Sequence, residues 1–143
     1  MRDDEWSQQR AEAVRLQAER LQARQDAEHT RAEALLREFV AAARDAGLPA
    51  EPLQVQGYGG RGTARTPLRG WYLRVDRTSG ISADGDFYVL TAPIGVLDRV
   101  RGVRPEPRRP PLLLGAGGKD GDSISLADAL ERLLPGWRAH SAG

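Results

Sequence analysis

The segment GWYLRVDRTSGISADGDFYVLTA, residues 70–92, contains the strongest sheet signal in the chain. It combines aromatic and β-branched residues with an Asp84-Gly85 pair, which is typical of a two-residue hairpin turn. A type I′ turn at this pair predicts that Ile81 lies opposite Tyr88. We therefore expect a central hairpin, with the other elements packed around it.

The two halves of this hairpin have different patterns. Trp71, Leu73 and Val75 alternate with more polar residues, which is typical of a strand with one buried face. Residues 87–90 are apolar throughout, which predicts a central strand covered on both faces. A further strand is expected at residues 53–56, where apolar residues again alternate with glutamines.

The N-terminal third of the chain predicts one long helix. Residues 3–46 contain no proline or glycine and are rich in strong helix formers, and Gly47 is suited to end the helix. Residues 30–46 have an apolar face wide enough to dock on a sheet, whereas the preceding part has a narrow stripe. We therefore divide the chain into a helical arm or extension, residues 1–29, and a single α+β domain, residues 30–143.

The stripe on the arm has two interpretations. Val14 and Leu21 continue the apolar face in steps of four and three residues, which favours self-association or a partner helix. Gln25 and Glu28 interrupt this face, which is typical of a solvated extension or a frayed terminus. A capping-box sequence that starts at Thr30 would also allow the helix to break there.

The chain after the hairpin is irregular. Residues 94–100 fit either an irregular strand or a short helical turn. Residues 101–111, RGVRPEPRRPP, predict an extended segment with polyproline character. Residues 112–114, three leucines, are expected to form a short buried strand, and residues 115–123 a glycine-rich turn.

A short C-terminal helix is expected after Ser125, a suitable N-cap residue that is followed by leucines at helical spacing. Trp137 is expected to fold back onto the domain, and residues 140–143 to be loose. Together these segments predict an α+β fold. It consists of a long N-terminal helix, a small, mostly antiparallel sheet of about three to five strands and a short C-terminal helix.

The composition excludes several chemistries. The chain has no cysteine, which removes disulfides, thiolate nucleophiles and cysteine-ligated zinc. It has no long apolar run, so we expect neither a signal peptide nor a membrane span, and a cytoplasmic location. All of the 21 basic residues except Lys119 are arginine, which fits the codon bias of a GC-rich bacterial genome or a need for bidentate phosphate contacts, and composition does not separate the two.

No catalytic, cofactor-binding or metal-binding residues are predicted. Residues 57–62 formally match GxGxxG, but residues 63–67 lead into another strand instead of the helix that a dinucleotide site needs. We therefore interpret this loop as a mobile hairpin connection, with nucleotide binding as the weaker alternative.

Two groups of polar residues were considered as sites and set aside. Asp26, His29 and Glu33 share one helical face, but they lack a second contributing segment, so they are interpreted as a surface charge cluster. Asp120 and Asp122 resemble only the start of a calcium loop. An enzyme that uses this turn is the least favoured of the three functional hypotheses.

The predicted register points to one candidate binding site. If the register continues along the hairpin, Trp71 lies opposite Asp98, and the segments that flank these residues approach each other. Arginines would then gather at one end of the sheet, with Asp84 and Asp86 at the other, a distribution that favours an anionic partner. The predicted arginines are Arg61, Arg65, Arg69, Arg99, Arg101 and Arg104.

These observations favour a non-enzymatic protein-interaction or scaffolding module that self-associates through its N-terminal helix or binds a protein partner. The alternative is that the arginines bind an anionic ligand or nucleic acid at one end of the sheet. No cofactor and no membrane partner are expected. The net charge of +1 does not distinguish between the two hypotheses.

Overall fold

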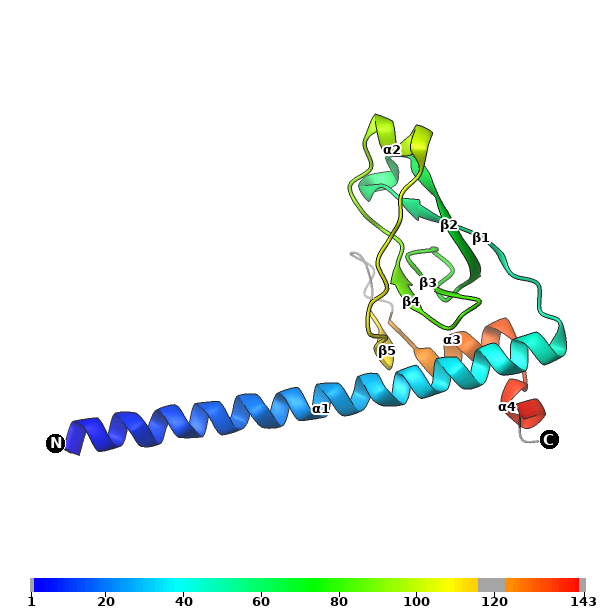
Figure 1. Cartoon of the computed structure of the whole chain (residues 1–143). Coiled ribbons are helices and arrows are strands. Elements are labelled where there is room, and N and C mark those ends of the chain that lie inside the picture. The colour runs from blue at the N-terminus through cyan, green and yellow to red at the C-terminus, as the bar shows by residue number, and fades with distance from the viewer. Residues whose placement is uncertain (1, 116–122, 142–143) are drawn as a thin grey trace.

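The structure, a computed structural model, describes residues 2–115 and 123–141. It has the predicted α+β architecture, with a long N-terminal helix, a four-stranded antiparallel sheet and short C-terminal helices. The sheet domain stands on one end of the long helix, and the other end projects away from it (Figure 1). The elements are α1 (Arg2–Ala46), β1 (Glu51–Gln56), the 3-10 helix η1 (Tyr58–Gly60), β2 (Thr63–Tyr72), β3 (Ser79–Ser82), β4 (Phe87–Val89), α2 (Val96–Arg101), β5 (Leu113–Leu114), β6 (Ile124–Ser125), α3 (Leu126–Leu133) and α4 (Trp137–Ser141).

Helix α1 is continuous, so the break that the sequence allowed at Thr30 does not occur. The Thr30 hydroxyl donates to the carbonyl oxygen of Asp26, at 2.8 Å, inside the helix instead of capping a new one. The helix ends as predicted. Gly47 has a φ of +68°, and the amide of Leu48 donates to a carbonyl oxygen of the last turn, at 2.9 Å.

Only the C-terminal part of α1 is covered by the rest of the chain. Every residue from 2 to 27 is exposed, whereas seven residues between Ala32 and Ala43 are buried. Among the described residues, the hydrogen bonds and ion pairs from α1 to later segments begin at Asp26. The division into an arm, residues 1–29, and a domain, residues 30–143, stays a prediction.

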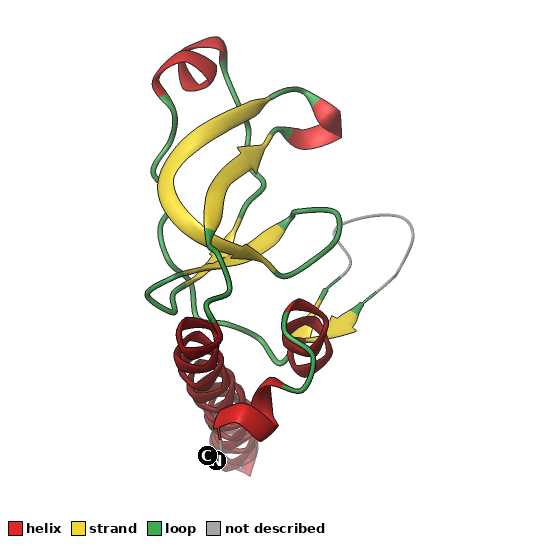
Figure 2. Ribbon diagram, turned by 90° about the vertical axis from the view of Figure 1, so that its right-hand side faces the viewer, coloured by secondary structure: helices red, strands yellow, loops and turns green. Residues whose placement is uncertain are grey.

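The sheet has the strand order β1-β2-β3-β4 and is strongly curled (Figure 2). Its first strand, β1, approaches the segment that follows its last strand, β4. The amide of Gln56 donates to the carbonyl oxygen of Leu90 at 2.8 Å, and the amide of Ala92 donates to the carbonyl oxygen of Gln56 at 3.0 Å. The close approach of β2 to β3 requires a glycine at Gly70, because a Cβ there would overlap the carbonyl oxygen of Ile81.

The turn at Asp84-Gly85 forms, but with a different register from the predicted one. A type I′ turn needs a positive φ at both central residues, and of these two only Gly85 has one, at +96°. The chain instead forms a three-residue loop with a bulge at Gly85, closed by a hydrogen bond from its amide to the carbonyl oxygen of Ser82, at 2.9 Å. Ile81 therefore pairs with Phe87, and the predicted pairing is wrong by one residue.

A second turn, at residues 73–78, divides what the sequence predicted to be one strand. Strand β2 ends before this turn and β3 begins after it. The amide of Arg77, which has a φ of +63°, donates to the carbonyl oxygen of Arg74 at 3.0 Å. Val75 lies in this turn and is 81% exposed, so the prediction that it faces the core is wrong.

The second turn also changes the partner of Trp71. This residue pairs with Ile81, so the predicted pairing with Asp98 is wrong. Strand β4 is an edge strand of the four-stranded sheet, although it was predicted to be central. The outer side of β4 is instead bridged by the proline-rich segment, where the amide of Arg108 donates to the carbonyl oxygen of Phe87, at 2.8 Å.

Two apolar clusters use the two faces of the sheet. The larger cluster lies between the sheet, α1 and the C-terminal helices. The smaller cluster, within the curl, consists of Leu53, Val55, Tyr88 and Leu90. Phe87 belongs to the first cluster and Tyr88 to the second, because successive side chains of a strand point to opposite faces. The prediction that this strand is covered on both faces is confirmed.

Phe39 of α1 joins the long helix to both the sheet and the C-terminus. Its buried ring meets the rings of Trp71, with centroids 5.8 Å apart, and Trp137, with centroids 5.5 Å apart, and both pairs are edge to face. The indole nitrogen of Trp71 also donates to the carbonyl oxygen of Pro49, at 3.1 Å. The prediction that Trp137 folds back onto the domain is confirmed.

The C-terminal predictions are confirmed in part. Ser125 caps α3, with its hydroxyl oxygen accepting from the amide of Asp128 at 3.1 Å. The chain continues as α4, so residues 140 and 141 are helical and not loose. Leu114 is buried in β5, but Leu113 is 56% exposed, so the predicted buried strand is only half buried. The predicted turn at residues 115–123 lies mostly outside the described residues, and so do Asp120 and Asp122.

Replacing Phe39 with alanine should lower the free energy of unfolding by roughly 3–5 kcal/mol, because it empties a large buried aromatic site. The matched control is Leu16→Ala on the same helix. Leu16 is 49% exposed, and its replacement should change stability by less than about 0.5 kcal/mol. Urea denaturation followed by tryptophan fluorescence measures both, and equal stability of the two variants would contradict this account of the core.

Candidate interaction site at the α2 end of the sheet

The sequence did not decide whether residues 94–100 form a strand or a helical turn. Most of this segment forms helix α2. The helix starts after Gly95, whose amide donates to Asp98 Oδ2 at 2.9 Å, so the carboxylate caps its first turn. Among the described residues, α2 contributes no buried side chain. The helix therefore exposes three large apolar residues, which are Val96, Leu97 and Val100.

The GxGxxG loop lies beside α2 and connects β1 to β2. The amide of Gly57 donates to the carbonyl oxygen of Gly62 at 2.8 Å, which closes the loop around η1. Strand β2 then begins at Thr63, so the third glycine does not start a helix. The loop is a hairpin connection, as predicted, and it lacks the helix N-terminus that holds the pyrophosphate in a dinucleotide site.

Two arginines connect α2 to this hairpin through backbone carbonyl groups. The Arg65 guanidinium donates to the carbonyl oxygen of Val100 at 2.9 Å, and that of Arg99 donates to the carbonyl oxygen of Arg61 at 3.0 Å. Gly102 has a φ of +82°, and a Cβ there would lie 2.7 Å from the carbonyl oxygen of Arg65. Neutral carbonyl partners hold these two arginines in place but leave their charges uncompensated.

The structure brings together five of the six predicted arginines, at the end of the sheet farthest from α1 (Figure 1). Arg69 lies toward the opposite end of β2. It is paired with Pro52, and its guanidinium donates to the carbonyl oxygen of Ala50 at 3.1 Å. The five that come together are Arg61, Arg65, Arg99, Arg101 and Arg104, and we call them the arginine cluster.

The route that brings the cluster together differs from the predicted one. The prediction extended the strand pairing of the hairpin as far as Trp71 and Asp98, and these two residues are not paired in the structure. Instead, the chain returns along β2 after α2, and the amide of Val103 donates to the carbonyl oxygen of Arg65 at 2.7 Å. The two arginine-containing segments therefore meet through this crossing segment.

The arginine cluster carries charge that its surroundings do not neutralise. None of its members forms an ion pair with a residue in the described ranges. The carboxylate of α2 itself, Asp98, is used to cap the helix. An open groove of about 600 Å³ runs between Arg65 on one side and Arg101 and Arg104 on the other. The arrangement therefore combines uncompensated positive charge with exposed apolar side chains.

The carboxylates predicted for the other end of the sheet lie beside α1. Asp84 lies in the β3–β4 turn and Asp86 directly follows it, and Arg44 of α1 donates to the carbonyl oxygen of Ala83 in this turn, at 3.2 Å. Burial raises the pKa of Tyr88, and the negative charges of these two aspartates raise it further. The two ends of the sheet thus differ in charge.

Sequence analysis missed the apolar part of this site. Val96, Leu97 and Val100 are spaced as neighbours on one side of a helix, but the same residues also fit an irregular strand. A strand would have buried some of them. The sequence therefore contains no clear signal that these three residues are exposed.

A second group of residues holds the proline-rich segment on α1. It consists of Asp26, His29 and Glu33 of α1 with Arg109 and Pro110, and we call it the clasp. Arg109 pairs with Asp26 at 3.1 Å and with Glu33 at 2.9 Å, and His29 Nδ1 donates to the carbonyl oxygen of Pro110 at 2.8 Å. The hydrogen bond to Glu33 is the main reason why the pKa of Arg109 is raised. The three α1 residues lie at the surface, and the folded chain adds a second segment that contacts them, which the sequence analysis did not foresee.

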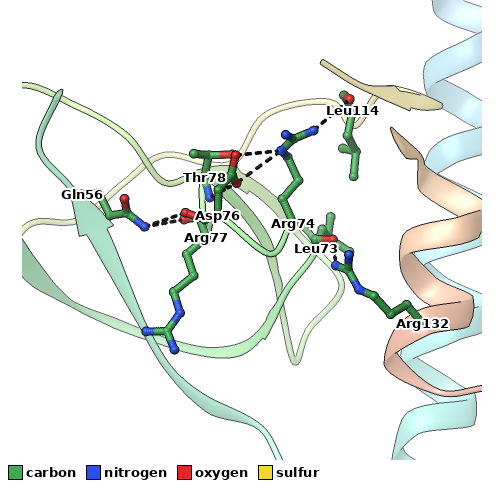
Figure 3. A network of polar contacts seen from close by, with 8 residues as sticks. All are labelled: Gln56, Leu73, Arg74, Asp76, Arg77, Thr78, Leu114 and Arg132. Carbon is green, nitrogen blue, oxygen red and sulfur yellow. Dashed lines mark hydrogen bonds and ion pairs between the residues drawn. The ribbon is translucent and has the colours of Figure 1, made fainter. Parts of the chain in front are cut away.

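A third polar group closes the β2–β3 turn (Figure 3). The Asp76 carboxylate accepts from Arg74 Nε at 3.2 Å, from the Thr78 amide at 3.1 Å and from the Thr78 hydroxyl at 2.7 Å. Partial burial by itself would raise the pKa of Asp76, but the hydrogen bonds from Thr78 and Arg74 outweigh it and lower that pKa. Gln56 of β1 donates to the carbonyl oxygen of Asp76 at 2.9 Å, which ties the turn to the sheet.

Replacing Asp76 with asparagine should lower the free energy of unfolding at pH 7 by roughly 0.5–1 kcal/mol, a modest value because the ion pair is partly exposed. A lowered pKa in the folded state means that the carboxylate stabilises the fold above its unfolded pKa, and that this stabilisation is lost as the pH falls through the folded pKa. The difference between the wild type and the variant should therefore narrow below about pH 4. Thermal unfolding between pH 3 and 7 tests this, with Asp84→Asn as the control, and a difference that does not vary with pH would contradict it.

No family model, curated protein or solved structure matches this chain. Within residues 2–115 and 123–141, no helix is both long enough and apolar enough to cross a membrane. The functional argument therefore rests on two exposed features, the uncovered part of α1 and the α2 end of the sheet.

Proposed function

We propose that this protein is a non-enzymatic interaction or scaffolding module that self-associates through the N-terminal part of α1. The observation that carries the proposal is the exposure of this helix from residue 2 to residue 27, a length of about 39 Å. Helical stability in proteins comes mostly from packing of an apolar face, and no described residue of the chain covers this part of α1. Its exposed large apolar residues are Trp6, Val14, Leu16 and Leu21.

The exposed stripe lies in line with the face that packs in the domain, with Gln25 and Glu28 between the two. Val14, Ala18 and Leu21 follow one another in steps of four and three residues, and the same steps lead on to Ala32 and Phe39, which are buried. A partner helix placed on the stripe would therefore extend the packing surface of the domain along α1. This continuity supports a contact with another helix more than random exposure does.

Charge supports an antiparallel pair of arms. In a parallel pair, identical residues face each other, and Glu28 would lie opposite the same residue of the second copy. In an antiparallel pair with Val14 opposite Leu21, Asp4 lies opposite Arg31 of the second copy. In the same register Glu28 lies opposite Ser7 of the second copy, so the contact between two Glu28 residues is removed.

Charge substitution on the stripe should separate the two copies. We expect light scattering after size-exclusion chromatography to give a dimer for the wild type and a monomer for the Val14→Glu, Leu21→Glu double variant. The matched control is Leu16→Glu, because Leu16 is exposed but lies about 200° round the helix from Val14 and about 140° from Leu21.

Two outcomes would contradict this proposal. A wild type that stays monomeric up to about 1 mM would rule out self-association of meaningful affinity. A dimer that survives the double variant, or that the Leu16→Glu control dissociates equally well, would show that the stripe is not the interface. Circular dichroism of each variant confirms that the domain remains folded.

The arginine cluster supports a second function, which is binding of an anionic partner such as nucleic acid. The specific observation is that none of the cluster's five arginines forms an ion pair with a described residue, although they lie around one groove and one helix. Uncompensated arginines that converge on a groove attract phosphate groups, and such binding weakens steeply with salt.

Charge reversal in the cluster tests this second function. The Arg101→Glu, Arg104→Glu double variant should abolish retention on a heparin column, because both side chains line the groove and neither forms a hydrogen bond with a described residue. The control is Arg20→Glu, Arg24→Glu on the exposed arm, which changes the net charge equally. No retention of the wild type at low salt, or equal loss in the control, would contradict the proposal.

A further inference from the structure

A cavity of about 380 Å³ lies apart from the α2 helix, between β3–β4, the proline-rich segment and β5. This volume is within the range of small-molecule sites. Its apolar wall includes Phe87 and Val89 of β4 and Leu114 of β5. These three side chains come from segments that only the folded chain brings together.

The cavity contains a buried hydroxyl group without a protein partner. Ser79 of β3 lines the cavity and is 6% exposed, and its Oγ forms no hydrogen bond with any residue that the structure describes. Buried polar groups are almost always hydrogen-bonded, and one left without a partner costs stability. A water molecule or a ligand atom in the cavity can supply the partner that the Ser79 hydroxyl lacks.

Strand pairing places this hydroxyl and a cation on the same wall. Ser79 pairs with Val89, and Arg108 is bridged to Phe87 on the other side of β4. Paired residues point to the same face of a sheet, and Phe87 and Val89 are two residues apart, so all four side chains share one face. The cavity lies on this face.

The charge balance of the lining indicates a ligand with one negative charge. Three arginines and no described carboxylate line the cavity. Arg74 pairs with Asp76, and Arg109 pairs with two carboxylates of α1. Arg108 forms neither an ion pair nor a side-chain hydrogen bond with any described residue, so one positive charge is left uncompensated.

The wall around this charge is held in place. Arg74 donates through Nε to Asp76 at 3.2 Å and through Nη1 to the carbonyl oxygen of Leu114 at 3.4 Å, so it links the β2–β3 turn to β5 (Figure 3). On the other side, the clasp holds Arg109 on α1. The cavity is therefore bordered by two compensated arginines and one uncompensated one.

We propose that this cavity is a binding site for a small monocarboxylate with an apolar body. The carboxylate accepts hydrogen bonds from Arg108 and from the Ser79 hydroxyl, and the apolar body packs against Phe87, Val89 and Leu114. A carboxylate supplies the single negative charge that Arg108 lacks and the acceptor that Ser79 lacks. The apolar wall selects ligands with an aromatic or aliphatic body over small inorganic anions.

The test uses the full chain labelled with ¹⁵N and two probes, 1-naphthoate and octanoate, one aromatic and one aliphatic. Each is paired with the uncharged alcohol of the same body, 1-naphthalenemethanol and octanol. At least one carboxylate should shift the amide resonances around Ser79, Val89 and Arg108 with a Kd of about 1 mM or tighter, and its alcohol should bind about 10-fold more weakly.

Two variants assign the polar contacts. Ser79→Ala and Arg108→Gln should each weaken binding of the carboxylate by about 10-fold, because each removes a hydrogen bond to a charged group. Ser79→Ala should leave the protein folded, because the lost hydroxyl has no protein partner. The control, Arg104→Gln, removes an exposed arginine outside the described lining and should change the Kd by less than about twofold.

Three results would overturn the proposal. The first is the absence of shifts at these residues with either carboxylate at about 5 mM. The second is equal affinity for a carboxylate and its alcohol, which would show that the charge is not recognised. The third is an unchanged Kd in both Ser79→Ala and Arg108→Gln, or an equal loss of affinity in Arg104→Gln.

Discussion

The structure depends on the edge-to-face packing of Phe39 between Trp71 and Trp137. These three rings come from α1, the sheet and α4, so this one contact joins elements from the start, the middle and the end of the chain. A small sheet is stable only when its hydrophobic surface is covered, for example by a helix. The C-terminal part of α1 and the two C-terminal helices cover the Phe87 face, and the curl of the sheet covers the Tyr88 face.

This arrangement leaves three surfaces that the fold does not use. The part of α1 that precedes Asp26, the first residue of the clasp, extends away from the domain. The α2 end of the sheet exposes an apolar helix beside uncompensated arginines. The cavity beside β4 contains a buried hydroxyl and one uncompensated arginine on the same face. They belong to different elements and can be altered separately, because residues far apart contribute independently to stability and binding.

Errors in the predictions arose where one local choice of turn had long-range consequences. Asp84 keeps a negative φ, so the hairpin has a three-residue loop and a register shifted by one. The turn at residues 73–78 was not recognised, although the hydrogen bonds from Thr78 to Asp76 that close it join residues only two apart in the sequence. The arginine cluster was nevertheless predicted almost correctly. The segment that follows α2 runs beside β2, and this contact brings together the two parts of the chain that contain the arginines.

The sequence by itself determined the long helix and its end at Gly47, the strand β1, the Ser125 cap and the α+β class. Each of these depends on residues close together in the chain, such as helix formers, a glycine with positive φ or a capping hydroxyl. Only the tertiary structure decided that Arg69 lies apart from the other arginines, that His29 holds Pro110 and that Ser79 faces a cavity. These positions depend on strand register and on contacts between distant segments, which no local pattern encodes.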